Sequence, residues 1–88
     1  MTNETIKNTI KILESVVKAL EIACDSELEK KKKANDEWIA GNLAYNDSIR
    51  QQELHWDTFM NLSEISSKKA YEMYKLEQLL KQRQLMKS

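Results

Sequence analysis

Proline is absent from the sequence, and glycine occurs only once in its 88 residues. Both residues interrupt helices, so their scarcity allows helices to run through most of the chain. Apolar runs are short as well: none exceeds three residues, whereas a membrane helix needs about 20 and a signal-peptide core about 7–15. We therefore expect an all-α protein without a membrane segment, located in the cytoplasm.

Residues that carry chemistry are equally scarce. The single cysteine, Cys24, cannot form an intramolecular disulfide, and its place in an apolar pattern favours a small buried side chain. The only histidine, His55, has Gln, Thr and Phe three and four residues away along a helix, and none of these is a strong metal ligand. Without a glycine-rich loop or a second catalytic base, we expect no enzymatic activity, no cofactor and no metal site.

Charge is balanced, with 14 basic and 14 acidic residues, which removes any global attraction to nucleic acid. The most concentrated basic stretch is Lys30, Lys31, Lys32 and Lys33. Successive helical residues differ by about 100°, so these lysines point around a helix instead of forming one stripe. We favour a solvated, salt-bridged surface for this run; binding of nucleic acid through the four lysines is the alternative.

The first half of the chain carries a heptad pattern. Apolar residues at alternating spacings of four and three form a first seam: Ile6, Ile10, Leu13, Val17, Leu20 and Cys24. A second, smaller seam lies about 110° away around the helix and consists of Ile12, Val16, Ala19 and Ala23. A helix with two apolar seams needs two neighbours, so we treat the first seam as a candidate contact between copies of the chain.

Between residues 27 and 37 the apolar pattern fades, and two interpretations remain open. Ser26 and Glu29 have the spacing of a capping box, which would begin a new helix. Alternatively, one helix continues to about residue 40. The phase of Leu28 and Trp38 favours continuation, because steps of about 100° per residue return both to the first seam.

The clearest turn signal lies at the middle of the chain. Gly41 and Asn42 suit a left-handed helix end, and residues 46–48 (Asn-Asp-Ser) can cap the next helix. After the turn, one side carries Ile49, Trp56, Met60, Ala70 and Tyr74, and a stripe about 100° away carries Phe59, Leu62, Met73 and Leu80. A break near residues 61–67, where serines weaken the pattern, would create a third helix.

These patterns predict one all-α domain over residues 1–88. It contains a helix at about 3–40, a turn at about 41–47 and a helix at about 48–86, folded as a long, coiled-coil-like antiparallel hairpin with arms of about 55–60 Å. Folding about the chain midpoint pairs Leu28 with Phe59 and Trp38 with Ile49. Two hairpins pairing as a four-helix bundle would bury the remaining seams, so we expect a homodimer or another protein partner.

Both tryptophans and the only phenylalanine fall in the half of the hairpin nearest the turn. Aromatic residues are favoured both in cores and as interface anchors, and acidic residues near Trp56 suit a basic partner. Core packing is the alternative interpretation of this cluster. The predicted partner-binding residues are Trp38, Tyr45, Ile49, Glu53, Trp56, Asp57, Phe59 and Met60.

The turn reads Trp-Ile-Ala-Gly over residues 38–41. A short helical hairpin with Trp and Gly at its turn resembles the small WXG-type substrates of type VII secretion. The turn is one residue longer than that family's Trp-x-Gly, and Tyr71 and Tyr74 are followed four residues later by Lys75 and Gln78 in place of an acidic residue. The resemblance implies a secretion partner as an alternative function. Small phage or plasmid proteins that block a host complex are similar in size and in their Lys/Asn/Ile-rich composition.

Taken together, the sequence predicts a small non-enzymatic interaction protein: an adaptor, inhibitor or assembly factor that docks a helix face onto a partner. Apolar anchors at heptad spacing would supply affinity, and charged rims would set the register.

Overall fold

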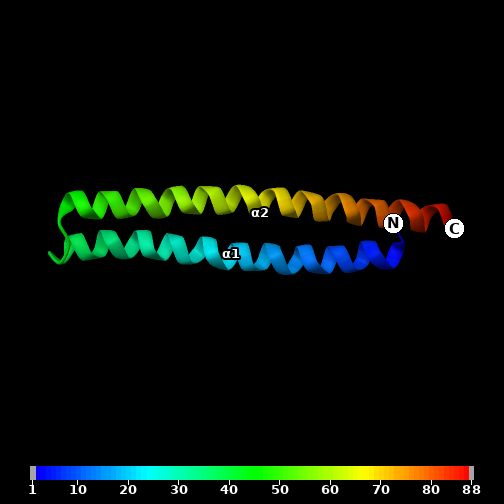
Figure 1. Ribbon diagram of the computed structural model, residues 1–88, viewed down its shortest axis with the longest axis horizontal. Coiled ribbons are helices and arrows are strands. Elements are labelled where there is room, and N and C mark those ends of the chain that lie inside the picture. The colour runs from blue at the N-terminus through cyan, green and yellow to red at the C-terminus, as the bar shows by residue number, and fades with distance from the viewer. Residues whose placement is uncertain (1, 88) are drawn as a thin grey trace.

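The computed structural model describes residues 2–87, with side chains described through residue 86. Its elements are two helices, α1 (Asn3–Ile39) and α2 (Tyr45–Lys87), which lie antiparallel as an extended hairpin (Figure 1). The hairpin is a rod measuring 66 × 17 × 14 Å. The predicted all-α hairpin is confirmed, and both helices are continuous, so neither a helix start at Ser26 nor a break at residues 61–67 occurs.

The first helix begins at a side-chain cap, and the turn contains the left-handed glycine that the sequence predicts. The Thr2 side chain accepts a hydrogen bond from the Thr5 backbone N–H at 3.1 Å and caps the first turn. At the other end, the Gly41 N–H donates to the Trp38 carbonyl and the Asn42 N–H to the Glu37 carbonyl, which is the Schellman pattern. Gly41 has a φ of 81°, a left-handed conformation that a side chain would strain.

The start of α2 differs from the expectation. The helix begins at Tyr45, before the three N-cap candidates at residues 46–48. Ser48 is instead fully buried, and its hydroxyl donates to the Ala34 carbonyl of α1 at 2.8 Å while accepting from Gln52 Nε2 at 3.0 Å. A serine that resembles a cap therefore joins the two helices where they approach closely.

Two contacts fix the register of the hairpin. Ser48 bonds Ala34, each seven residues from Gly41, and His55 bonds Glu27, each fourteen residues from Gly41. The hairpin therefore folds about Gly41 and not about the chain midpoint. Each α1 residue faces an α2 residue about five positions earlier than predicted, so the expected pairing of Leu28 with Phe59 is wrong.

The buried seam follows the strict heptad in both helices. In α1 it continues from Cys24 through Glu27, Lys31 and Ala34, whereas Leu28 lies beside the seam and is 38% exposed. Straight-helix steps of about 100° drift by roughly 20° per heptad relative to this supercoiled seam, which explains the misplaced Leu28. The α2 side of the seam is Ser48, Gln52, His55, Phe59, Leu62, Ser66, Lys69, Met73, Leu76, Leu80 and Arg83, all buried or half-buried.

The core that results is thin. The chain exposes 6663 Å² of surface, well above the roughly 5,000 Å² of a compact protein of this mass. At the open end, Arg83 Nη1 donates to Asn3 Oδ1 at 3.0 Å. Two helices alone can cover only the faces they turn toward each other, so much apolar surface remains outside the seam.

Candidate protein-interaction surfaces

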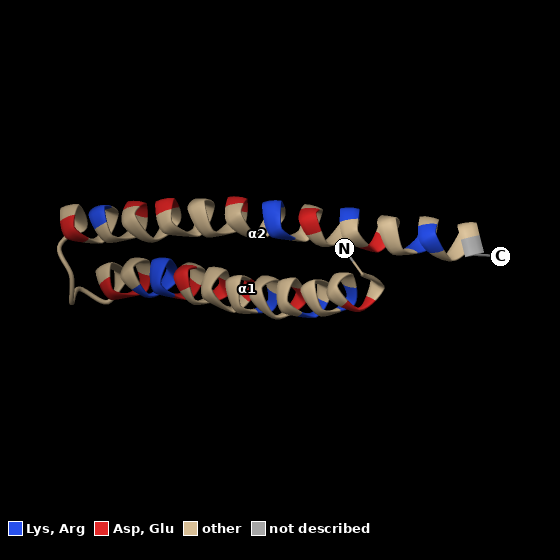
Figure 2. Ribbon diagram, turned by 45° about the vertical axis from the view of Figure 1, so that its right-hand side comes forward, with Lys and Arg blue, Asp and Glu red and all other residues tan. Residues whose placement is uncertain are grey.

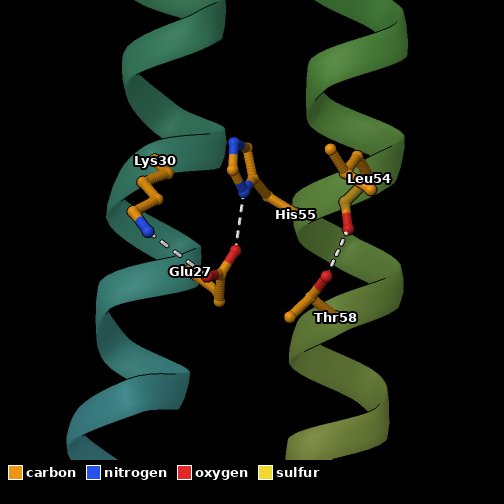
Figure 3. A network of polar contacts seen from close by, with 5 residues as sticks. All are labelled: Glu27, Lys30, Leu54, His55 and Thr58. Carbon is orange, nitrogen blue, oxygen red and sulfur yellow. Dashed lines mark hydrogen bonds and ion pairs between the residues drawn. The ribbon is translucent and has the colours of Figure 1, made fainter.

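The seam is polar in the half of the rod nearest the turn. His55 Nδ1 donates to Glu27 Oε2 at 2.6 Å across the helices, and Lys30 Nζ donates to Glu27 Oε1 at 3.4 Å (Figure 3). The Glu27 side chain is only 15% exposed. This pair replaces the apolar contacts of a usual coiled coil, and such polar seam pairs fix register more than they add stability.

The carboxyl group of Glu27 titrates abnormally as a consequence. The hydrogen bond from His55 holds the pKa of Glu27 below its ordinary value, burial opposes that shift, and the positive charge of Lys30 adds to the lowering. A carboxyl group with a lowered folded-state pKa stabilises the fold above its unfolded-state pKa, and this contribution is lost as pH falls through the folded value.

Acidification should therefore destabilise the wild-type protein more than Glu27→Gln. We expect the free energy of unfolding, measured by urea denaturation, to fall more steeply for the wild type between about pH 5 and pH 3. Identical pH profiles for the two proteins would contradict the Glu27–His55 contact.

A groove beside this polar seam is lined in part by Trp56, one of the predicted partner-binding residues. It has a volume of about 370 Å³ and is lined by Lys31, Ile49, Gln52, Glu53 and Trp56. The indole of Trp56 is 44% exposed and lies below Lys31 Nζ, which is 5.7 Å from the ring centroid. The Lys31 ammonium group packs over the Trp56 ring, and the exposed part of the ring can contact another protein.

The predicted partner-binding residues separate into two groups. Trp38 and Tyr45 form an edge-to-face pair at the turn, with ring centroids 5.2 Å apart. Trp56 stacks on Phe59 at 5.3 Å, and Phe59 itself is half-buried in the seam. Ile49 and Glu53 line the Trp56 groove, whereas Met60 and Asp57 are exposed farther along α2.

Sequence reasoning missed two members of the groove, Lys31 and Gln52. Both occupy seam positions where an apolar residue would be expected. Heptad spacing continued from Cys24 reaches Lys31, and the same spacing counted back from Phe59 reaches Gln52. Of the lysine run, Lys31 lies over Trp56 and Lys30 pairs with Glu27, while Lys32 and Lys33 are exposed. The four lysines therefore point in different directions.

The opposite flank of the seam carries a second surface, which we call the central apolar face. A groove lined by Thr9, Leu13, Glu72, Lys75 and Leu76 shows which edges of α1 and α2 share this flank. Heptad-equivalent positions on those edges place six apolar residues there: Ile12, Val16, Ala19, Ala23, Leu54 and Ile65. Ile12 is 64% exposed, so the hairpin does not cover this face.

The six residues of the first seam lie within the hairpin itself. Ile6, Leu13 and Cys24 are buried, and Ile10, Val17 and Leu20 are half-buried along the surface that α1 turns toward α2. A second chain must therefore contact another face. The predicted second seam of α1, which includes the exposed Ile12 and Val16, is available for that contact.

Charge is balanced overall but divided along the rod. Residues 21–64, the half nearest the turn, contain ten acidic and five basic residues; the remainder contain four acidic and nine basic residues. Figure 2 shows acidic residues predominating on α2 near the turn and basic residues recurring toward its C-terminal end. The turn half thus has a formal charge of −5 and the terminal half +5.

No protein-family model, curated protein or solved structure matches this chain. Among residues 2–87, neither helix is long and apolar enough to cross a membrane. Within the same part of the chain, no three His, Cys, Asp or Glu side chains gather as a metal site would require.

Proposed function

We propose that this protein is a non-enzymatic interaction module that docks the Trp56 groove of α2 onto a helix of a partner protein. The observation that carries the proposal is the half-exposed Trp56 in a groove that flanks the seam. Large aromatic residues at the surface are the commonest anchors of protein interfaces. The chain thus serves as an adaptor, inhibitor or assembly factor.

The chemistry of the groove favours an amphipathic helix with basic flanks. Ile49 and the face of Trp56 offer apolar contact, and Gln52 offers an amide for hydrogen bonding. Glu53 lies in the groove wall and Asp57 is exposed one turn farther on, within the half of the rod that carries a charge of −5. Lys and Arg residues at the ends of the partner helix would complement this charge and guide its approach.

The test compares Trp56→Ala with Tyr71→Ala, a change at another exposed aromatic residue of α2. Crosslinking in the native host followed by mass spectrometry identifies the partner segment, which is then synthesised and titrated by calorimetry. We expect Trp56→Ala to weaken binding roughly 10- to 100-fold and Tyr71→Ala to leave it within about twofold.

Circular dichroism confirms that each variant stays helical. Unchanged affinity for the folded Trp56→Ala variant would refute the proposal, as would a partner segment that is acidic or not helical.

A further inference from the structure

We infer that the central apolar face is covered by a second copy of this chain, packed antiparallel as a two-fold four-helix bundle. The inference shares with the proposed function the premise that exposed apolar faces of the hairpin are covered by protein. It concerns the opposite flank of the seam, however, and names the partner and its orientation.

The central apolar face lies at the middle of the rod. Measured along the helices from Gly41, its residues extend from Leu54, thirteen residues away, to Ile12, twenty-nine residues away. Their mean position is about twenty-two residues from Gly41, close to half the length of α2. A two-fold axis across the rod at this level lays one central face directly on the other.

Side-chain sizes on the face suit an antiparallel pair. Val16 and Ile65 lie at nearly the same level, 25 and 24 residues from Gly41, while the smaller Ala23 and Thr58 lie at 18 and 17. Reversal of the second chain brings the large pair of one copy opposite the small pair of the other. A parallel pair would place four large residues in one layer and four small ones in the next, which overpacks one layer and leaves a void in the other.

The divided charge selects the same orientation. Reversal places the terminal half of one copy, with its charge of +5, beside the turn half of the other, with −5. A parallel pair would join like charges at both ends. Such long-range complementarity sets orientation and encounter rate more than affinity, and it is screened beyond about 8–10 Å at physiological salt.

The available area is sufficient for a stable dimer. The broad side of the rod measures 66 by 17 Å, so overlap of even half its length removes about 1,100 Å² of surface in total from the two copies. Stable interfaces bury about 1,200–2,000 Å², a range that a two-thirds overlap reaches. Ala19 at the centre allows the two backbones to approach closely.

The first test pairs Ile12→Lys with Ile22→Lys. Both changes place a lysine on α1 at a highly exposed isoleucine, 64% and 71% respectively, but only Ile12 belongs to the central apolar face. In light scattering after size-exclusion chromatography, we expect the wild type and Ile22→Lys to be dimers and the dimer of Ile12→Lys to dissociate at least tenfold more readily. An interface of this size is expected to have a dissociation constant of about 1 µM or below. Equal dissociation of the two variants, or a wild type that is monomeric at about 100 µM, would overturn the inference.

The second test measures orientation. A nitroxide at Asn42→Cys, in the exposed turn, is introduced with Cys24→Ala so that each chain carries one label. Double electron–electron resonance should give an interlabel distance of about 65 Å, because about forty-four residues of helix rise separate the two turns in an antiparallel dimer. A distance below about 20 Å would show a parallel dimer and refute the inference.

Different variants test the binding of a partner helix at Trp56 and dimerisation through the central apolar face. Trp56→Ala should remain dimeric while losing the partner helix, and Ile12→Lys should bind the partner helix while losing the dimer. Loss of dimerisation in Trp56→Ala, with the helices intact, would place the self-contact on the wrong flank and overturn this inference alone.

Discussion

Leu13→Ala is expected to lower the free energy of unfolding by about 2–4 kcal/mol. Leu13 is one of few buried apolar residues, at 8% exposure, and it lies in the middle of the apolar half of the seam. Its removal leaves a void between α1 and α2. Urea denaturation followed by circular dichroism, at one protein concentration for all variants, provides the measurement.

Ile22→Ala is the matched control, because it removes a similar aliphatic side chain from the outward surface of the same helix. Its effect should stay within about 0.5 kcal/mol of zero. Equal losses of stability for the two variants would mean that α1 does not turn Leu13 toward α2.

Ser48→Leu should cost about 2–4 kcal/mol, since it combines overpacking with the loss of a buried hydrogen bond. The Ser48 hydroxyl lies 2.8 Å from the Ala34 carbonyl, which leaves no space for a larger side chain between the helices. The helices would have to separate near the turn, where Gln52 also loses its bond to Ser48.

Ser67→Leu makes the same change at an exposed position of α2 and should alter stability by less than about 0.5 kcal/mol. A Ser48→Leu variant as stable as the wild type would contradict the close approach of the helices at Ala34. Greater stability would mean that residue 48 lies on an ordinary apolar seam.

The sequence predicts the helical hairpin because the signals for it are local. Heptad spacing from Ile6 to Cys24 marks the inner face of the first helix, and Gly41 ends that helix. These signals depend on neighbours within a few residues, so they can be recognised without knowing what α2 contributes.

The register could not be predicted in the same way. It depends on polar contacts between residues far apart in the chain, Ser48 with Ala34 and His55 with Glu27. Serine near a turn is usually a cap, and His55 has no acidic residue three or four positions away, so the sequence alone indicates neither contact between the helices. Lys31 and Gln52 are polar residues at seam positions, so they were not predicted as members of the binding surface. Ile49, Glu53 and Trp56, which line the same groove, were predicted.

The two flanks of the seam carry different surfaces, and we propose a different contact for each. The polar, turn-proximal half carries the exposed Trp56 and an excess of acidic residues, which suits a basic helix. The central apolar face around Ala19 carries small and large side chains at levels that interlock with a reversed copy. Dimerisation would place two Trp56 grooves on one particle, and two linked sites bind a paired target more tightly than either site alone.

Sedimentation equilibrium of the unmodified chain tests most directly whether another chain covers the faces that the hairpin leaves open. At micromolar concentrations and near-neutral pH, we expect a species of twice the 10.3 kDa chain mass that dissociates on dilution. A fully helical 10.3 kDa species that persists at about 100 µM would contradict self-association of the chain through its central apolar face.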